Sequence, residues 1–440
     1  MVSDDNSPQL VSDFFPGTVL LVDLDGTLET RHAQAHRDIV LVPTPSDDPD
    51  DPLNWSRWRK TLLMTTLCVY CLAVGIASAA IYSVLVPISA ATGLTVGDLN
   101  YGTGYMFLTF GWGCLIWQPL AQKFGKRPVY LLSLLGTTVL QGTFGAPIES
   151  LCEISVSDVY FAHERGTYIA YYALFLGGSN CVAPVISGFI NDGQGWEWVL
   201  TFLDKIKIFR SEHVQGSVPL KGMLIRPFKY FSLSIVVFCG FMYGAVVCYF
   251  NALNGTASII LSAPPYSFKP SSVGLCYIAN VVGVFLGSFF SGPGGDKLVL
   301  YLTRRNNGIR EPEYRLWLYA VLLLLVPGGL LLWGVGAAHQ VRCCQIPLSY
   351  CIDCYTELGS DAIVTIILIR NTMSFAMGYG VTPWVTGMGY QSAFLVAAFV
   401  AMAQFSLAFV FIKYGKQLRR KSTASYFKYL KQVKNDGLIH

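Results

Sequence analysis

The fold is decided by residues 392–412, which read SAFLVAAFVAMAQFSLAFVFI and contain no charged side chain. About 20 apolar residues is the length at which an α-helix crosses the hydrocarbon core of a bilayer. Similar runs occur at Thr61–Leu85, Tyr168–Ile190, Phe231–Tyr249 and Leu316–Leu332. The sequence therefore predicts an all-α, polytopic membrane protein.

The composition narrows the class of protein further. Hydrophobic residues make up 53% of the 440 residues and charged residues only 13%, against roughly 25% charged in an average soluble domain. Disordered chains have few apolar residues and many charges, so that class is excluded. The 31 basic and 27 acidic residues give a net charge of +4, and no basic stripe stands apart from the apolar runs, so we expect no nucleic-acid partner. The twelve cysteines are scattered and indicate small packing residues, not a disulfide framework.

Nine apolar runs are predicted as spans, near residues 61–86, 101–120, 128–148, 168–190, 230–253, 272–292, 315–338, 361–385 and 389–413. Lys and Arg gather before the first run, after the second and after the last, and basic loops mark the cytosolic side of a membrane protein. Both termini are therefore predicted to be cytosolic, which requires an even number of crossings. At three places the chain must cross the membrane again, but the segment there is too short or too polar for an ordinary span. We call these segments the deficient returns; they lie between Arg127 and Arg165, between Asp192 and Lys205, and between His339 and Asp361. We therefore expect three shortened or missing spans.

These boundaries divide the chain into five parts. They are a cytosolic N-terminal tail with an interfacial segment (1–60), an N-terminal transmembrane half (61–204), a cytosolic central loop (205–229), a C-terminal transmembrane half (230–413) and a cytosolic C-terminal tail (414–440). Residues 1–50 are rich in Asp, Ser and Pro and are predicted to be mostly disordered.

Six stretches resemble motifs of one family of transporters. They are Asp47–Trp55, Ala121–Tyr130, Glu149–Asp158, His163–Gly166, Asn191–Trp196 and Gly378–Gly387. On these stretches the chain resembles the major facilitator superfamily, in particular its fungal twelve-span drug:proton and polyamine-type antiporters. The resemblance implies two six-helix halves that rock around a central site near the membrane midplane. It also favours the plasma membrane, and we expect a monomer.

In that fold the three deficient returns correspond to the span 3/4 junction, span 6 and span 10. They indicate a chain that lacks short internal blocks.

The loop after span 2 carries a version of the family's loop signature, usually Gly-x-Leu-Ala-Asp-Arg-x-Gly-Arg-Arg. Here Gln122 replaces the acid, and Gly125 permits a tight turn. The cations of the loop are Lys123, Lys126 and Arg127. The resemblance implies a charge-based latch between helices, which Gln122 would weaken. The alternative is that the three cations only set the topology.

A fainter copy of this signature follows span 8 and keeps its acid, as Asp296-Lys297. Span 5 resembles the antiporter signature Gly-x-x-x-Gly-Pro-x-x-Gly-Gly. The positions that carry this likeness are Ala183, Pro184, Ser187 and Gly188. Small residues at this spacing let helices approach closely, and a proline bends the helix. The resemblance implies a role in antiport, with close packing as the alternative.

Two carboxylates carry the clearest chemical signal. Glu149 and Glu153 are four residues apart, so they share one face of a helix. Carboxylates inside a membrane are costly and mark proton or cation paths. We hypothesise that they bind the coupling proton, a cationic substrate or both; the alternative is that the shortened span 3/4 region leaves them at the water interface. No Lys or Arg lies between Arg127 and Arg165, so the family's basic residue at the start of span 4 has no counterpart.

Polar and aromatic residues on spans 7 and 11 are candidates for the wall of a central cavity. They are Tyr243, Tyr249, Asn251 and Asn254 on or near span 7, and Asn371, Tyr379 and Trp384 on span 11. Aromatic rings there could hold an amine by cation–π contact, and ordinary interhelical packing is the alternative for each. Arg370 lies deep in its run and needs an acidic partner, for which Asp361 and Glu357 are the nearest in sequence.

Two further motifs suggest other chemistry. Leu21–Thr27 contains Asp23 and Asp25 in a DxDGT pattern typical of haloacid-dehalogenase-type phosphatases, but too few soluble residues surround it for such a domain. A polar stretch before span 11 holds His339, Cys343, Cys344, Cys351 and Cys354. Their spacing matches no familiar zinc arrangement, so no metal and no cofactor are predicted.

The sequence therefore predicts secondary active transport. We expect proton-coupled efflux or exchange of a small organic molecule, such as an organic cation, a drug or a fungal secondary metabolite. No enzymatic activity is predicted, and the lack of a Walker-type loop argues against direct ATP coupling. Because of the shortened spans, the alternative is a truncated or decayed isoform without transport activity.

Overall fold

The computed structural model describes residues 17–23, 32, 38–46, 48, 51–136, 143, 145–195, 225, 227–263, 267–335 and 359–435. The first part of the chain holds β1 (Val19–Leu20), η2 (Pro52–Asn54), α1 (Arg57–Ala79), η3 (Ala80–Ser83), α2 (Leu85–Thr92), α3 (Val96–Phe124), α4 (Lys126–Gly136), α6 (Pro147–Val159) and α7 (Arg165–Gln194). The second part holds η4 (Tyr230–Ser232), α10 (Ser234–Ser262), α11 (Pro270–Cys276), α12 (Ile278–Phe289), η5 (Phe290–Gly294), α13 (Gly295–Arg305), β2 (Ile309–Arg310), η6 (Pro312–Leu318), α14 (Tyr319–Val335), α16 (Gly359–Met388) and α17 (Tyr390–Asn435).

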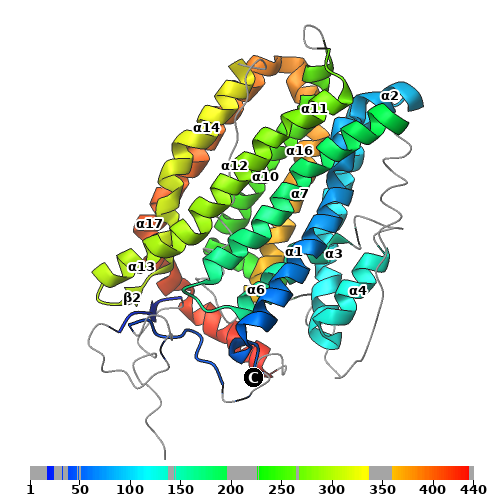
Figure 1. Ribbon diagram of the computed structural model, residues 1–440. Helices are drawn as coiled ribbons and strands as arrows, with labels where there is room; N and C mark the ends of the chain where they lie inside the picture. The colour runs from blue at the N-terminus through cyan, green and yellow to red at the C-terminus, as the bar shows by residue number, and fades with distance from the viewer. Residues whose placement is uncertain are drawn as a thin grey trace, which may run out of the picture.

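These elements form a bundle of long helices that run side by side (Figure 1). α1 packs along α7 in the first half, while α10 packs along α16 and α14 along α17 in the second. The most extensive contacts between the halves are those of α3 with α16 and of α7 with α11 and α12. One end of the bundle carries α13, β2 and the C-terminal end of α17, at the bottom of Figure 1. We call it the basal end.

Seven helical segments in the described residues are long and apolar enough to cross a membrane. They are Arg57–Ser83, Arg165–Gln194, Ser234–Ser262, Pro270–Arg305, Pro312–Leu331, Ala362–Met388 and Ser392–Lys428. Each overlaps one predicted run, and α3, a helix of 29 residues, covers the run at 101–120.

In the described residues, the run at 128–148 belongs to two helices. Its first part lies in α4, of 11 residues, and its end lies in α6, of 13 residues, each shorter than the ~20 residues of an ordinary span. The span 3/4 junction is therefore shortened, as predicted. The segments expected to hold spans 6 and 10 lie outside the described residues, as does the cysteine-rich stretch before span 11.

Glycines allow the close crossing of α3 and α16. A Cβ on Gly104 would lie 3.3 Å from the Phe375 carbonyl oxygen, and one on Gly111 would lie 2.6 Å from the Asn371 Cβ. Small residues are the usual means by which membrane helices approach this closely. The crossing fixes the position of α16, and therefore of Asn371, relative to the first half.

The antiporter-like stretch of α7 lies at another close contact between the halves. A Cβ on Gly188 would lie 2.5 Å from the Pro270 carbonyl oxygen of α11, and one on Gly274 would lie 2.6 Å from the Pro184 carbonyl oxygen. Ala183 and Ser187 are buried in the same helix. The stretch therefore packs closely, and its role in antiport stays a prediction.

We expect Gly188→Val to destabilise the protein by about 1–3 kcal/mol, because the new side chain must push α11 away from α7. Thermal unfolding of the purified protein in detergent measures the effect. Gly178→Val is the matched control, since it lies on the same helix and a Cβ there meets nothing within 4 Å. Equal unfolding temperatures for the two variants would contradict the packing argument.

Part of the N-terminal tail is folded. β1 pairs antiparallel with β2, and Val22 and His32 bridge to Ile39 and Val40. Leu21 has 0% of its surface exposed. The prediction of a mostly disordered tail is therefore wrong for residues 17–23 and 38–46.

The phosphatase interpretation gains no support from this fold. Asp23 lies beside a sheet of two short antiparallel strands, whereas the phosphatase needs a doubly wound parallel sheet.

Candidate functional site

Charged side chains from both halves meet inside the bundle. α6, of the first half, carries Glu149 and Glu153, which are only 7% and 2% exposed. α16, of the second half, brings buried Arg370 and Asn371, and α10 brings buried Tyr243. α6 reaches this position because it packs against α1, α3, α7 and α16. The water-interface alternative for the two glutamates therefore does not hold.

Arg370 is the centre of this cluster. Its Nη2 forms an ion pair with Oε1 of Glu149 and donates a hydrogen bond to Oδ1 of Asn371 at 3.0 Å. Its Nη1 donates to the Tyr243 hydroxyl at 2.9 Å, and the guanidinium lies 4.8 Å from the centroid of the Tyr243 ring. The amide of Asn371 donates to Oε2 of Glu149 at 2.6 Å. Both oxygens of Glu149 are thus held by groups of the other half.

This arrangement compensates two charges that would be costly alone. Removing a single charge from water costs several kcal/mol, and a close, hydrogen-bonded partner offsets that cost. The pair therefore couples the positions of α6 and α16, because separating the halves here would leave both charges unpaired.

A cavity of about 180 Å³ borders the pair. One water needs ~10–15 Å³ on this scale, so the cavity has room for roughly a dozen waters or a small organic molecule. Glu149, Arg370 and Tyr243 are among the polar residues of its wall, and most of the other lining residues are apolar, such as Phe107 and Leu330. Apolar walls with a few convergent polar groups are typical of sites for small molecules.

Glu153 lies one turn beyond Glu149 and is not among the residues that line the cavity. Its Oε2 has no hydrogen-bond partner within the described part of the chain. It interacts electrostatically with Arg370 and Glu149. A buried carboxylate with an unsatisfied oxygen is costly as an anion and is stabilised by taking up a proton.

Tyr249 also lines the cavity, whereas the other four predicted wall residues lie apart from the cluster. Asn251 and Asn254 are buried in α10, and neither is among the cavity-lining residues. Tyr379 is 51% exposed and stacks on Tyr101 with ring centroids 4.3 Å apart. The Trp384 indole donates to the sulfur of Met388 at 3.2 Å. A role for these four residues in binding stays a prediction.

Arg370 pairs with an acid that its sequence neighbourhood did not suggest. The nearest acids in sequence are Asp361 and Glu357, whereas the structure pairs Arg370 with Glu149 of the other half. Glu357 and the Asp361 side chain lie outside the described residues. The sequence does contain one indication of this pair. Arg370 and Glu149 are both ionisable residues predicted inside the membrane, and such residues tend to pair with each other.

The first signature loop forms the expected turn. Gly125 has φ +84, a conformation that favours glycine. Lys126 forms an ion pair with Asp158 of α6, and the Lys123 ammonium lies 5.2 Å from the centroid of the Phe124 ring. Gln122 is partly buried, and the Arg127 side chain lies outside the described part.

The second signature loop connects the halves near the basal end. Asp296 accepts hydrogen bonds from the backbone N and the hydroxyl of Thr167, both at 2.7 Å, and from Nη2 of Arg315 at 2.8 Å. Thr167 lies in the first turn of α7, where backbone N–H groups lack partners within the helix. A Cβ on Gly166 would lie 2.3 Å from Oδ1 of Asp296. Lys297 is exposed and takes no part in the contact.

No family profile matches the chain. It is 23% identical to an uncharacterised MFS-type transporter of Schizosaccharomyces pombe, over 94% of each chain. It is 21% identical to protein HOL1 of Saccharomyces cerevisiae, over 92% of this chain and 95% of the relative. It is 24% identical to the efflux pump FUBT of Fusarium oxysporum, over 85% of this chain and 76% of the relative.

A solved structure shares the fold. The human organic anion transporter MFSD10 superimposes with a TM-score of 0.52 and 15% identity, covering 80% of this chain and 100% of the other. The predicted resemblance to fungal transporters of the major facilitator superfamily, and the predicted fold, are therefore confirmed.

The alignment with the Schizosaccharomyces pombe protein also concerns the short internal blocks that are predicted to be absent from this chain. It extends over 547 positions with the Schizosaccharomyces pombe protein, more than the 440 residues of this chain. Because 94% of both chains is aligned, most of the resulting gaps lie within this chain and not at its ends. The prediction that short internal blocks are absent agrees with this difference.

Proposed function

We propose that this chain, which has the major facilitator fold, is a secondary transporter of a small organic molecule. The observation that carries the proposal is the Glu149–Arg370 pair, which joins the two halves at the wall of an apolar cavity. In this fold, transport is a rocking of the halves around a central site. A bound substrate that competes for either charge would change how strongly the halves are held together.

The walls of the cavity favour a substrate with an apolar body and one polar or charged group. Glu149 could hold an organic cation once it is released from Arg370, and the Tyr243 ring adds a cation–π surface. Drugs and fungal metabolites include molecules of this kind, and one relative is named an efflux pump.

We further propose that protons drive the transport. Glu153 supports this, because protonation would neutralise a buried carboxylate next to the Glu149–Arg370 pair without breaking that pair. The basic loops support a topology with both termini in the cytosol. We place the protein in the plasma membrane as a monomer.

Flux into proteoliposomes tests this function, with the fluorescent organic cation rhodamine 6G as the probe. We expect the purified protein to accumulate the dye faster when the vesicle lumen is more acidic than the medium, so that protons leave as the dye enters, than when the pH is equal on both sides. Glu149→Gln should reduce that flux to background, because it removes the acceptor for a cation and leaves Arg370 without its carboxylate.

Glu164→Gln is the matched control, because it makes the same change at an exposed glutamate that precedes α7 and does not line the cavity. It should leave the flux unchanged. Flux equal to that of protein-free liposomes under every condition would favour the inactive isoform, and full activity of Glu149→Gln would remove Glu149 from the mechanism.

A further inference from the structure

The described part of the N-terminal tail lies across the basal end of the bundle. We call residues 17–23 and 38–46 the strap. β1 of the strap pairs with β2, with Val19 opposite Arg310 and Leu20 opposite Ile309. The backbone N of Leu21 donates to the Gly308 carbonyl at 3.0 Å. The strap is thus joined to the connection between α13 and η6, in the second half.

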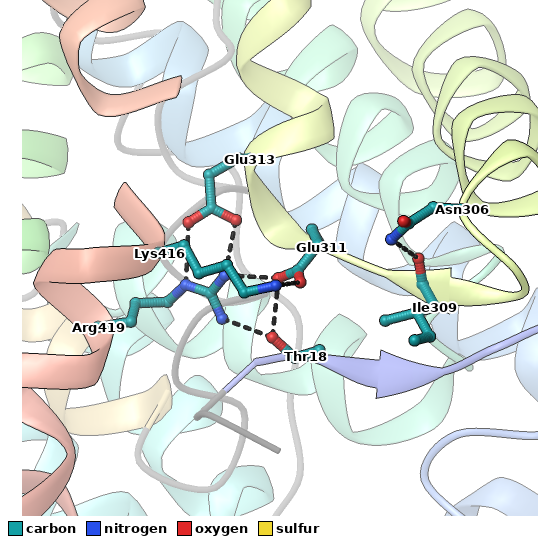
Figure 2. Close-up of polar contacts among 7 residues, drawn as sticks. All are labelled: Thr18, Asn306, Ile309, Glu311, Glu313, Lys416 and Arg419. Carbon is teal, nitrogen blue, oxygen red and sulfur yellow. Dashed lines mark hydrogen bonds and ion pairs between the residues drawn. The ribbon is translucent and has the colours of Figure 1, made fainter. Parts of the chain in front are cut away.

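A buried charge cluster holds the same end of the strap (Figure 2). Arg419 of α17 has 0% of its surface exposed. It donates to Glu313 from Nε at 2.9 Å and from Nη2 at 2.7 Å, and to Glu311 from Nη2 at 2.6 Å. Its Nη1 donates to the Thr18 hydroxyl at 2.9 Å, which itself donates to Glu311 at 2.8 Å. Lys416 donates to the other oxygen of Glu311 at 2.6 Å.

The charges of this cluster balance, with two carboxylates against two cations. Burial raises the pKa of Glu311, but hydrogen bonds from Lys416, Arg419 and Thr18 outweigh that effect and hold the pKa below its usual value. The carboxylate is therefore ionised at neutral pH. Thr18 is the strap's own member of the cluster, and its hydroxyl bridges Arg419 and Glu311.

The other end of the strap is fixed to the first half. The Val42 carbonyl accepts a hydrogen bond at 2.8 Å from the backbone N of Ala162, between α6 and α7. The Asp51 carboxylate accepts from the Ser46 backbone N at 2.9 Å and from the Leu53 backbone N at 2.9 Å. Asp51 caps η2, which precedes α1.

We propose that the strap is a tether between the two halves at the basal end, which holds that end closed and must release when the halves rock. Its root belongs to the first half and its docking surface to the second, so separating the halves there must break β1–β2 pairing and the contacts of Thr18. The tether acts beside the Thr167–Asp296 contact, which also crosses between the halves. Its role in a transport cycle rests on the proposed function.

Hydrogen–deuterium exchange of the full chain in detergent tests the tether without any substrate. The backbone N–H of Thr167 is the reporter, because Asp296 of the other half accepts its hydrogen bond. We expect Leu21→Asp, which places a charge at a fully buried strap position, to raise exchange about tenfold or more in residues 19–22 and at Thr167. Thr18→Val keeps the side-chain shape and should give a smaller increase at both places.

Thr61→Val is the matched control for Thr18→Val, because Thr61 is an exposed threonine of α1 outside the strap, and it should change neither signal. If either strap variant exchanges faster in the strap but not at Thr167, the strap does not hold the halves together and the proposal is wrong. If exchange in the strap itself is unchanged, these residues do not hold the strap on the second half, and the proposal is again wrong. Because the reporter needs no transport, an inactive protein would still give a clear result.

Discussion

Arg370→Met is expected to destabilise the protein by about 3–5 kcal/mol and to abolish dye flux, because it leaves Glu149 buried without its cation. Methionine fills much of the space of the arginine stem, so the loss reflects the charge more than the volume. The change also removes the donor to Tyr243 and to Asn371. Thermal unfolding in detergent measures the stability, and the proteoliposome assay measures the flux.

The double variant R370M/E149Q separates the two effects. Removing both charges together should recover most of the lost stability, since neither charge is then buried alone. Flux should stay at background, because the polar centre of the cavity is gone. Arg370→Lys keeps the charge but cannot make all the guanidinium contacts at once, so an intermediate stability is expected. If the single and double variants unfold at the same temperature, the pair does not hold the halves together.

Much of the fold could be predicted because the deciding signals are local. A run such as 392–412 is apolar throughout, and any such run must form a helix inside a bilayer. Gly125 predicts a turn for the same reason, because a positive φ favours glycine at that one position. The motif predicts Asp296 as its loop acid, but it does not predict the partners Thr167 and Arg315.

The pairing at the site could not be read in the same way. Glu149 and Asn371 are 222 positions apart, and nothing near either residue specifies the other. Glu149 reaches the interior because the short α6 packs among helices of both halves, which depends on tertiary structure alone. The requirement that buried charges be paired predicts that a partner exists, but not which one.

The strap could not be predicted from the sequence for a different reason. β1 and β2 are two residues each, too short for an alternating pattern to show. Thr18 and Arg419 are 401 positions apart. The composition of residues 1–50 is polar overall, and an average over that length hides the few apolar residues, such as Leu21 and Ile39, that are buried.

Glu153→Gln is expected to remove the effect of a proton gradient on flux while leaving the protein folded. Glutamine has the shape of the protonated carboxylic acid but cannot release a proton, so it fixes the neutral state that burial favours. Glu149 and Arg370 stay paired in this variant, so the cavity and its polar centre remain. Dye accumulation under a proton gradient should fall to the level reached without one, whereas exchange of dye across the membrane at equal pH should continue.

Glu164→Gln again supplies the control, since it removes an exposed carboxylate at the start of α7 and should keep the gradient effect. Unfolding at the wild-type temperature would show that Glu153→Gln acts on coupling and not on folding. The comparison with Glu149→Gln then separates the two roles, because loss of exchange at equal pH belongs to substrate binding and loss of the gradient effect alone belongs to the proton. A Glu153→Gln protein that is still driven by the gradient would exclude Glu153 as the proton site, and Glu149 would be the remaining carboxylate of the cluster able to carry it.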